Sequence, residues 1–140
     1  MGTFAHHVRE QDLNDRLEAL RLAGLSEWPY GVAGDPAQQL KGEAIDASTF
    51  GRSWTGERVG FGPFVQYVDA DGTFVERGPN MQVTGAASRQ GDLLCLTFPA
   101  LSLGRPLCGP IYRNPTGSPD KQDEYTYLNA YEAKRFSVTP

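Results

Sequence analysis

The hydrophobic positions in the first part of the chain follow a helical spacing. Leu13, Leu17 and Leu20 recur every three to four positions, with polar residues between them. The stripe stops at Gly24, a residue typical of helix ends. We therefore predict a helix over residues 9–24 that docks through its leucine face.

The next segment is rich in turn-forming residues. Trp-Pro-Tyr-Gly and Gly-Asp-Pro sequences predict an irregular connector over residues 25–41. Ala44, Ile45 and Ala47 then favour a second, short helix over residues 42–50, which Gly51 would end.

From residue 51 onward, apolar and polar positions alternate in short runs, which is the pattern of β-strands. The runs at 64–68 and 73–77 flank an Asp-Gly turn, a strong signal for a hairpin. The runs at 82–88 and 93–98 flank Gln-Gly-Asp and predict a second hairpin. Further strands are predicted at 52–56, 108–113, 125–129 and 134–138.

This order of elements predicts a mainly β fold. We expect a single antiparallel meander that forms a small barrel or sandwich, with an N-terminal helix and a second short helix. The 140 residues fit one domain over 1–140, of which 51–140 is the β domain.

Composition narrows the choice of partners. A net charge of -4 argues against nucleic acid, and no apolar run approaches the length of a membrane span. The expected partner is therefore an unidentified small molecule or a protein domain. The first residues lack the basic and apolar regions of a signal peptide, so the chain as given is expected to be cytoplasmic, or periplasmic after removal of a signal.

The two cysteines, Cys95 and Cys108, each lie in a strand-like context. The segment between them can fold back, so we expect the two residues on neighbouring strands. A disulfide and a pair of reduced, buried cysteines both fit this placement.

Few residues have the chemistry of a catalytic or metal site. An Asp-x-Asp-Gly sequence at 69–72 resembles the start of a calcium loop, but Asn80 stands where the loop needs Glu. His6 and His7 lie near the terminus, away from any expected site. We therefore predict a hairpin turn at 69–72, and neither a metal, a cofactor nor a catalytic residue.

Aromatic residues and arginines gather in two parts of the β region. In one interpretation, the aromatic rings fill the core and the arginines face solvent. In the other, these residues line a small-ligand pocket in which an arginine binds an anionic group. Alternation places Arg52 and Trp54 on the same side of their strand. The candidate ligand-binding residues are Arg52, Trp54, Tyr67, Tyr112 and Arg113.

Two stretches resemble a known kind of accessory domain. They are residues 13–31, with Leu-Arg-x-Ala-Gly-Leu-x-Glu-Trp-Pro-Tyr-Gly, and residues 50–115, with Phe-Gly-Arg-x-Trp-x-Gly, Gly-Asp-x-Leu-Cys and Cys-Gly-Pro-Ile-Tyr-Arg-Asn-Pro. Together they resemble the C-terminal domain that follows the catalytic domain in some proteobacterial class III adenylate/guanylate cyclase-like proteins. The second stretch also resembles small β-rich bacterial domains of unknown function with paired cysteines.

The resemblance implies a non-catalytic regulatory or sensory module, because the metal-binding aspartates of the cyclases have no counterpart here. We expect a ligand- or partner-binding module, an accessory domain of a nucleotide cyclase. The alternative is a stand-alone small β-barrel protein with an unrecognised enzymatic or structural role.

Overall fold

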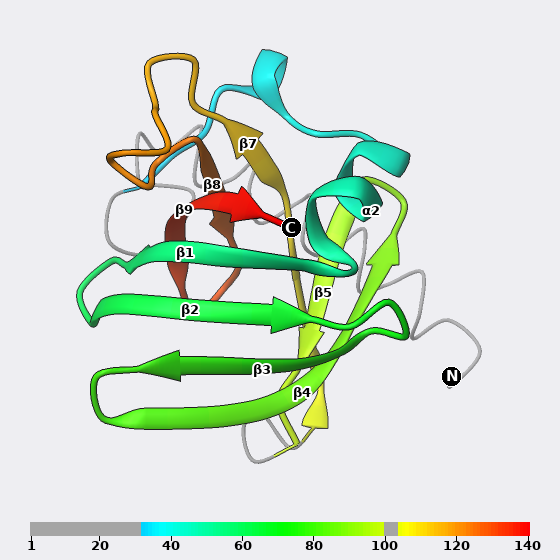
Figure 1. The fold of residues 1–140 in the computed structure, drawn as a ribbon. Helices are drawn as coiled ribbons and strands as arrows, with labels where there is room; N and C mark the ends of the chain where they lie inside the picture. Colours follow the sequence, from blue (N-terminus) through cyan, green and yellow to red (C-terminus); the bar gives the residue numbers. More distant parts are fainter. Residues whose placement is uncertain (1–31, 100–103) are drawn as a thin grey trace.

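The chain folds into one curved antiparallel sheet, seen in a computed structural model that describes residues 32–99 and 104–140 (Figure 1). The helix expected over 9–24 lies outside the described residues. The expected mainly β fold, an antiparallel meander forming a nearly closed barrel, is confirmed. Within the described ranges, no helix has the length and apolar character that crossing a bilayer requires.

The described part contains a 3-10 helix, an α-helix and nine strands. They are η3 (Pro36–Gln38), α2 (Glu43–Thr49), β1 (Arg52–Arg58), β2 (Gly62–Val68), β3 (Thr73–Gly78), β4 (Met81–Gln90), β5 (Leu93–Thr97), β6 (Pro106–Gly109), β7 (Ile111–Arg113), β8 (Tyr125–Leu128) and β9 (Ala133–Thr139).

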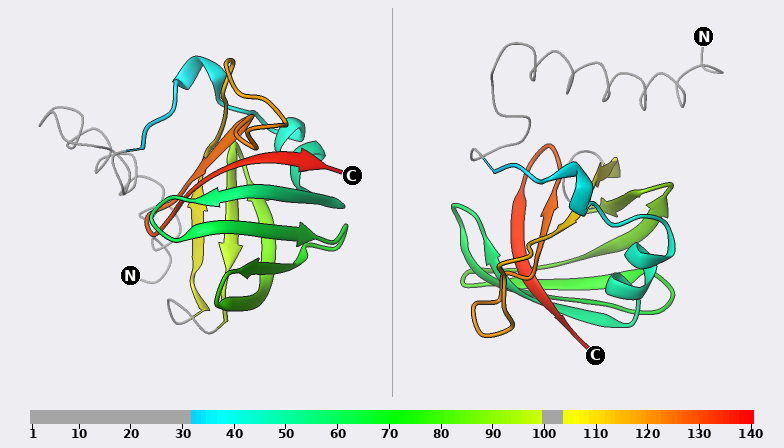
Figure 2. Two further views of the ribbon diagram at one scale, coloured as in Figure 1. Left: turned by 60° about the vertical axis from the view of Figure 1, so that its left-hand side comes forward. Right: turned by 90° about the horizontal axis from the view of Figure 1, so that it is seen from above.

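The sheet curls into a nearly closed barrel because β6 and β7 follow each other directly in the chain but pair with different strands, β5 and β8. Its strand order is β6-β5-β4-β3-β2-β1-β9-β8-β7, so β6 and β7 are its two edges. Yet only Pro110 separates β6, which pairs with β5, from β7, which pairs with β8. The amide of Leu128 donates to the Pro110 carbonyl at 3.1 Å across this point. The meander therefore curls round on itself (Figure 2).

The split at Pro110 differs from the single strand expected over 108–113. Proline has no amide hydrogen to donate, so a continuous ladder on both sides of it is excluded. The chain bends here and exchanges one strand partner for the other. The Asp-Gly turn is as expected: Thr73 donates its amide to Asp71 Oδ1 at 2.9 Å, and Gly72 has φ 96°.

One end of the barrel is filled by apolar side chains and covered by α2. Ile45 of α2 is fully buried in the main core. The indole of Trp54 donates to the Ser48 carbonyl of α2 at 2.8 Å and stacks on Phe136 with ring centroids 3.9 Å apart. The second expected helix therefore closes the end at which β1 begins.

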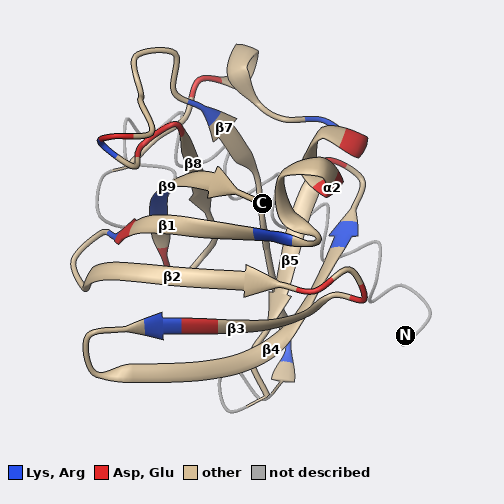
Figure 3. Ribbon diagram, viewed as in Figure 1, with Lys and Arg blue, Asp and Glu red and all other residues tan. Residues whose placement is uncertain are grey.

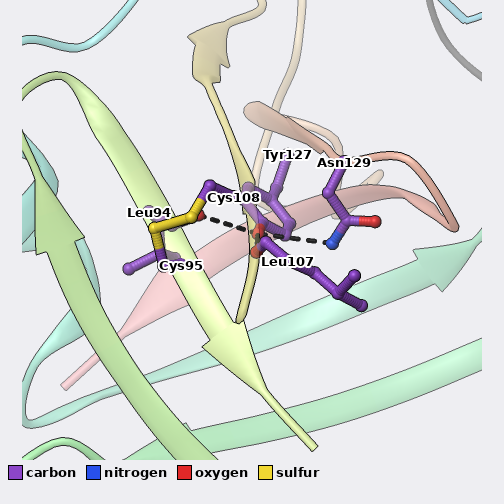
Figure 4. The surroundings of a disulfide bond; sticks show 6 residues. All are labelled: Leu94, Cys95, Leu107, Cys108, Tyr127 and Asn129. Atoms are coloured by element: carbon purple, nitrogen blue, oxygen red, sulfur yellow. Dashed lines mark hydrogen bonds between the residues drawn. A yellow bond between two sulfur atoms is a disulfide. The ribbon is translucent and has the colours of Figure 1, made fainter. Parts of the chain in front are cut away.

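A disulfide joins β5 to β6 in the barrel wall. Cys95 and Cys108 face each other in the strand register and are bonded, with Cα atoms 3.9 Å apart. The hydroxyl of Tyr127, on β8, lies 2.9 Å from the Leu94 carbonyl and 3.1 Å from the Leu107 carbonyl (Figure 4). Burial raises the pKa of this hydroxyl, which keeps it a donor. Three neighbouring segments are therefore tied together where the barrel closes.

Candidate ligand-binding site

The end of the barrel opposite α2 contains a cavity of about 350 Å³. It lies where β1, β3, β5 and β8 end and the following strands begin. We call it the mouth cavity. Its apolar wall is formed by Phe61, Met81, Val83, Phe98, Leu107 and Tyr131.

A second cavity, of about 260 Å³, adjoins the first and follows the β1–β2 and β3–β4 turns. Both cavities are lined by Arg58, Phe61 and Met81. The guanidinium of Arg58 lies over the Phe61 ring, 4.6 Å from its centroid, and its Nη1 donates to Met81 Sδ at 3.2 Å. Arg58 thus forms the wall between the two spaces.

Three charged side chains line the mouth cavity: Arg58, Glu76 and Glu132. Lys134 completes the group and is fully buried. We refer to these four residues as the buried charge cluster. In Figure 3 the acidic and basic positions of β3 lie near its end, next to the turn to β4, whereas β2 has no charged position.

Strand alternation brings the cluster inside the barrel. Glu76 follows the core residue Phe74 by two positions, and Lys134 precedes the core residue Phe136 by two. Since side chains two positions apart share a face of a strand, each charge points inward with its aromatic neighbour. The signal is present in the sequence as alternation with Phe74 and Phe136, although one interpretation of the pattern placed charged side chains in solvent.

Lys134 is the centre of the cluster. Its Nζ contacts Glu76 Oε1 and lies 3.2 Å from Glu132 Oε1. It also donates to Gln66 Oε1 at 2.9 Å. Arg58, its direct neighbour in the β1–β9 register, binds Glu132 Oε2 through Nε at 3.1 Å. Glu132 therefore bridges two cations that would otherwise repel each other.

The surroundings of Glu132 keep it ionised. Burial alone would raise the pKa of this carboxyl, but the charges of Lys134 and Arg58 outweigh burial and hold the pKa below its ordinary value. Asn129 supports the same geometry: its Nδ2 donates to Glu132 Oε1 at 3.3 Å, and its Oδ1 accepts the Glu132 amide at 3.0 Å. The acid is thus fixed at the cavity wall as a charged acceptor.

Two buried polar atoms of this region have no hydrogen-bond partner among the described residues. They are Glu76 Oε2 and Gln66 Nε2. Arg58 Nε lies 3.8 Å from Glu76 Oε2, too far for a hydrogen bond. Arg58 thus balances the charge of this oxygen at a distance, but a buried carboxylate oxygen that accepts no hydrogen bond is unfavourable.

The structure does not bring the five sequence-derived candidates together. Trp54 is fully buried in the core, and Tyr112 is buried in a second, smaller cluster with Val32, Leu128 and Ala133. None of the five lines either described cavity. The rest lie apart from these two: Arg52 is half-buried at the start of β1, Tyr67 is 43% exposed on β2, and Arg113 is exposed, its guanidinium 5.9 Å from the Tyr125 ring centroid.

The separation has a simple physical origin. Arg52 and Trp54 share a face of β1, as alternation requires. Both lie near the start of this strand, at the end of the barrel that α2 covers. The open space lies at the other end of the same strand, beside Arg58.

Within the described ranges, no group of three or more His, Cys, Asp and Glu residues is placed to hold a metal ion. No protein-family model, curated protein or solved structure matches the chain.

Proposed function

We propose that this protein is a non-catalytic binding module that holds a small molecule in the mouth cavity. One observation carries the proposal: an apolar-walled space of about 350 Å³ is lined by three charged side chains, Arg58, Glu76 and Glu132. Small-molecule sites are typically concave and mainly apolar, with a few fixed polar groups that orient the ligand.

The energetics of the buried charge cluster support a role in binding. Buried ion pairs contribute little net stability, because desolvation offsets their attraction, and apolar residues of similar size are often as stable. Stability alone therefore gives no reason for four charged residues at this place. A site that must recognise a polar group does give one.

The same charges weigh against the enzymatic alternative. An efficient general base has a pKa near the working pH, whereas the cations beside Glu132 hold its pKa below the ordinary range. Glu76 has one carboxylate oxygen in contact with Lys134. Glu132 is thus suited to accept hydrogen bonds rather than to exchange protons near neutral pH.

Two expectations from the sequence stay predictions. Regulation of a nucleotide cyclase rests on the resemblance alone. For the compartment, the disulfide supports the periplasmic alternative, because disulfides persist in oxidising surroundings.

Binding is tested with the neutral fluorophore N-phenyl-1-naphthylamine, whose emission rises in apolar surroundings. The change Val83→Phe adds a ring where the side chain lines the mouth cavity, and Thr84→Phe adds it at the next, exposed position of β4. We expect the unaltered chain and Thr84→Phe to bind the probe alike, and Val83→Phe to bind it about tenfold more weakly. Far-UV circular dichroism checks that both variants fold. No binding to the unaltered chain, or equal binding by both variants, contradicts the proposal.

A further inference from the structure

We infer that the mouth cavity selects an uncharged, mainly apolar molecule that ends in a hydroxyl group, and that Glu76 Oε2 accepts the hydrogen bond of that hydroxyl. The inference rests on the proposed function, and it names the chemical class of the ligand. Three features of the site lead to it: an unpaired acceptor, a balanced charge and a tethered arginine.

The unpaired acceptor is the first feature. Glu76 is 1% exposed and lines the mouth cavity. Its Oε1 contacts Lys134, while its Oε2 has no hydrogen-bond partner among the described residues. Oε2 lies 3.8 Å from Nε of Arg58, which also lines the cavity, so we assign this oxygen of Glu76 to the bound molecule. An acceptor of this kind requires a donor, and a hydroxyl supplies one.

The charge balance is the second feature. The cluster contains two cations, Arg58 and Lys134, and two carboxylates, Glu76 and Glu132, so its formal charge is zero. An ammonium or carboxylate on the ligand would add an unbalanced charge to a buried site, which is strongly unfavourable. An uncharged donor satisfies Glu76 Oε2 without disturbing the balance.

The tethered arginine is the third feature. Arg58 would be the natural partner of an acidic ligand. Its Nε already binds Glu132 Oε2 at 3.1 Å, and its Nη1 donates to Met81 Sδ at 3.2 Å. A ligand carboxylate would also lie close to Glu76, which repels it. Two of the five N–H donors of Arg58 are thus in use, and this tether together with the repulsion from Glu76 makes the cluster less suited to anions than its two cations suggest.

The rest of the cavity sets the body of the ligand. Val83, Phe98 and Leu107 offer only apolar surface. A chain or ring of carbon atoms gains free energy there by leaving water, in proportion to the area it buries. A medium-chain alcohol combines both requirements in the simplest form.

The test is a displacement series with the full chain at pH 7. N-phenyl-1-naphthylamine is displaced by 1-octanol, by its isomer heptyl methyl ether, by octanoate and by octylammonium. The ether has the same atoms as the alcohol but no donor, and the two ions carry opposite charges. We expect 1-octanol to bind about tenfold more tightly than the ether, as one hydrogen bond to a charged acceptor implies, and more tightly than either ion.

Other results overturn the inference in distinct ways. Equal affinities for alcohol and ether, within about twofold, mean that water satisfies Glu76. If octanoate or octylammonium binds more tightly than 1-octanol, the site recognises a charged group instead of a hydroxyl. If the fluorophore binds but none of the four molecules displaces it, the hydroxyl class is wrong and the binding function stands. If the fluorophore itself does not bind, both proposals fail.

A variant links the preference to one atom. In Glu76→Gln the amide oxygen can still accept from Lys134, and an NH₂ donor takes the place of Oε2. We expect this variant to lose the preference for 1-octanol over the ether, whereas Glu57→Gln, the same change at an exposed position of β1, keeps it. A preference that persists in folded Glu76→Gln overturns the role of Glu76. If Glu76→Gln does not fold, the series with the unaltered chain decides.

Discussion

Lys134 and Glu76 form an ion pair inside the barrel, and neither side chain is more than 1% exposed. The two residues come from β9 and β3, which are separated in the sheet by β1 and β2. The pair therefore reaches across the interior rather than along the ladder. Each charge makes the burial of the other tolerable, and Gln66 on β2 adds a hydrogen bond to Lys134 at 2.9 Å.

Removing one member of this pair leaves an uncompensated charge. We expect Lys134→Met to lower the free energy of unfolding by about 3–5 kcal/mol, because Glu76 and Glu132 lose the cation they share. Urea denaturation at pH 7 measures this change.

The matched controls use the same strand and the same pair. Arg135→Met, at the next and exposed position of β9, should change the free energy of unfolding by less than about 0.5 kcal/mol. The double change Lys134→Met with Glu76→Leu should lose less stability than Lys134→Met alone, since no unpaired carboxylate remains at position 76. A single change no more harmful than Arg135→Met would contradict the energetic role of the pair.

The disulfide should stabilise the barrel measurably. Cys95 and Cys108 are 13 positions apart, so the loop-entropy relation gives about 3 kcal/mol for the bond. We expect the double change Cys95→Ala with Cys108→Ala to lower the unfolding midpoint in urea, and dithiothreitol to lower it similarly in the unaltered chain. The double variant should not respond to dithiothreitol. A midpoint that stays constant while two thiols become titratable would show that the bond adds no stability.

Gly109 occupies the closest approach at the barrel closure. A Cβ added there would lie 1.5 Å from the Leu128 carbonyl oxygen, so backbone must move to admit it. We expect Gly109→Ala to lower the free energy of unfolding by about 3 kcal/mol, the upper range of overpacking. At Gly78 the added Cβ meets the flexible Met81 side chain at 3.0 Å, and the loss should be below about 1 kcal/mol. Equal losses in the two variants would argue against a tight closure at Gly109.

Much of this architecture could be predicted from local sequence patterns. The runs on either side of the Asp-Gly turn became β2 and β3, because that turn and alternation act over only a few residues. The short helix before β1 was recognised in the same way, as α2 spans Glu43–Thr49 within the expected 42–50. The placement of Cys95 and Cys108 on neighbouring strands follows from the reversing segment between them, whereas their directly opposite register is seen only in the structure.

The site was harder to predict, because it depends on which barrel end is filled. Trp54 and Arg58 face the same interior, but α2 covers the end beside Trp54, whereas the mouth cavity lies beside Arg58. Alternation predicts which face of a strand a side chain occupies, but it does not predict beside which end of the barrel that side chain lies. The pairing of Lys134 with Glu76 also joins strands far apart in sequence, which no local pattern reports.

Glu132 makes the free energy of unfolding of the barrel depend on pH. Burial would raise the pKa of its carboxyl, but Lys134 and Arg58 hold the folded-state pKa below the ordinary value of 4.5. A carboxyl with a lowered pKa stabilises the fold when the pH is above 4.5, and this contribution is lost as the pH falls through the folded-state pKa. We therefore expect the free energy of unfolding to fall from pH 6 to pH 3.

The change Glu132→Gln isolates this contribution. The variant should be less stable than the unaltered chain at pH 6, because Lys134 and Arg58 lose a shared anion. It should also lose less stability between pH 6 and pH 3, since the group with the lowered pKa is gone. Glu57→Gln, at an exposed position, should keep the acid dependence of the unaltered chain. Urea unfolding of all three proteins at both pH values provides the comparison, and parallel losses in Glu132→Gln and the unaltered chain would show that Glu132 is not the group responsible.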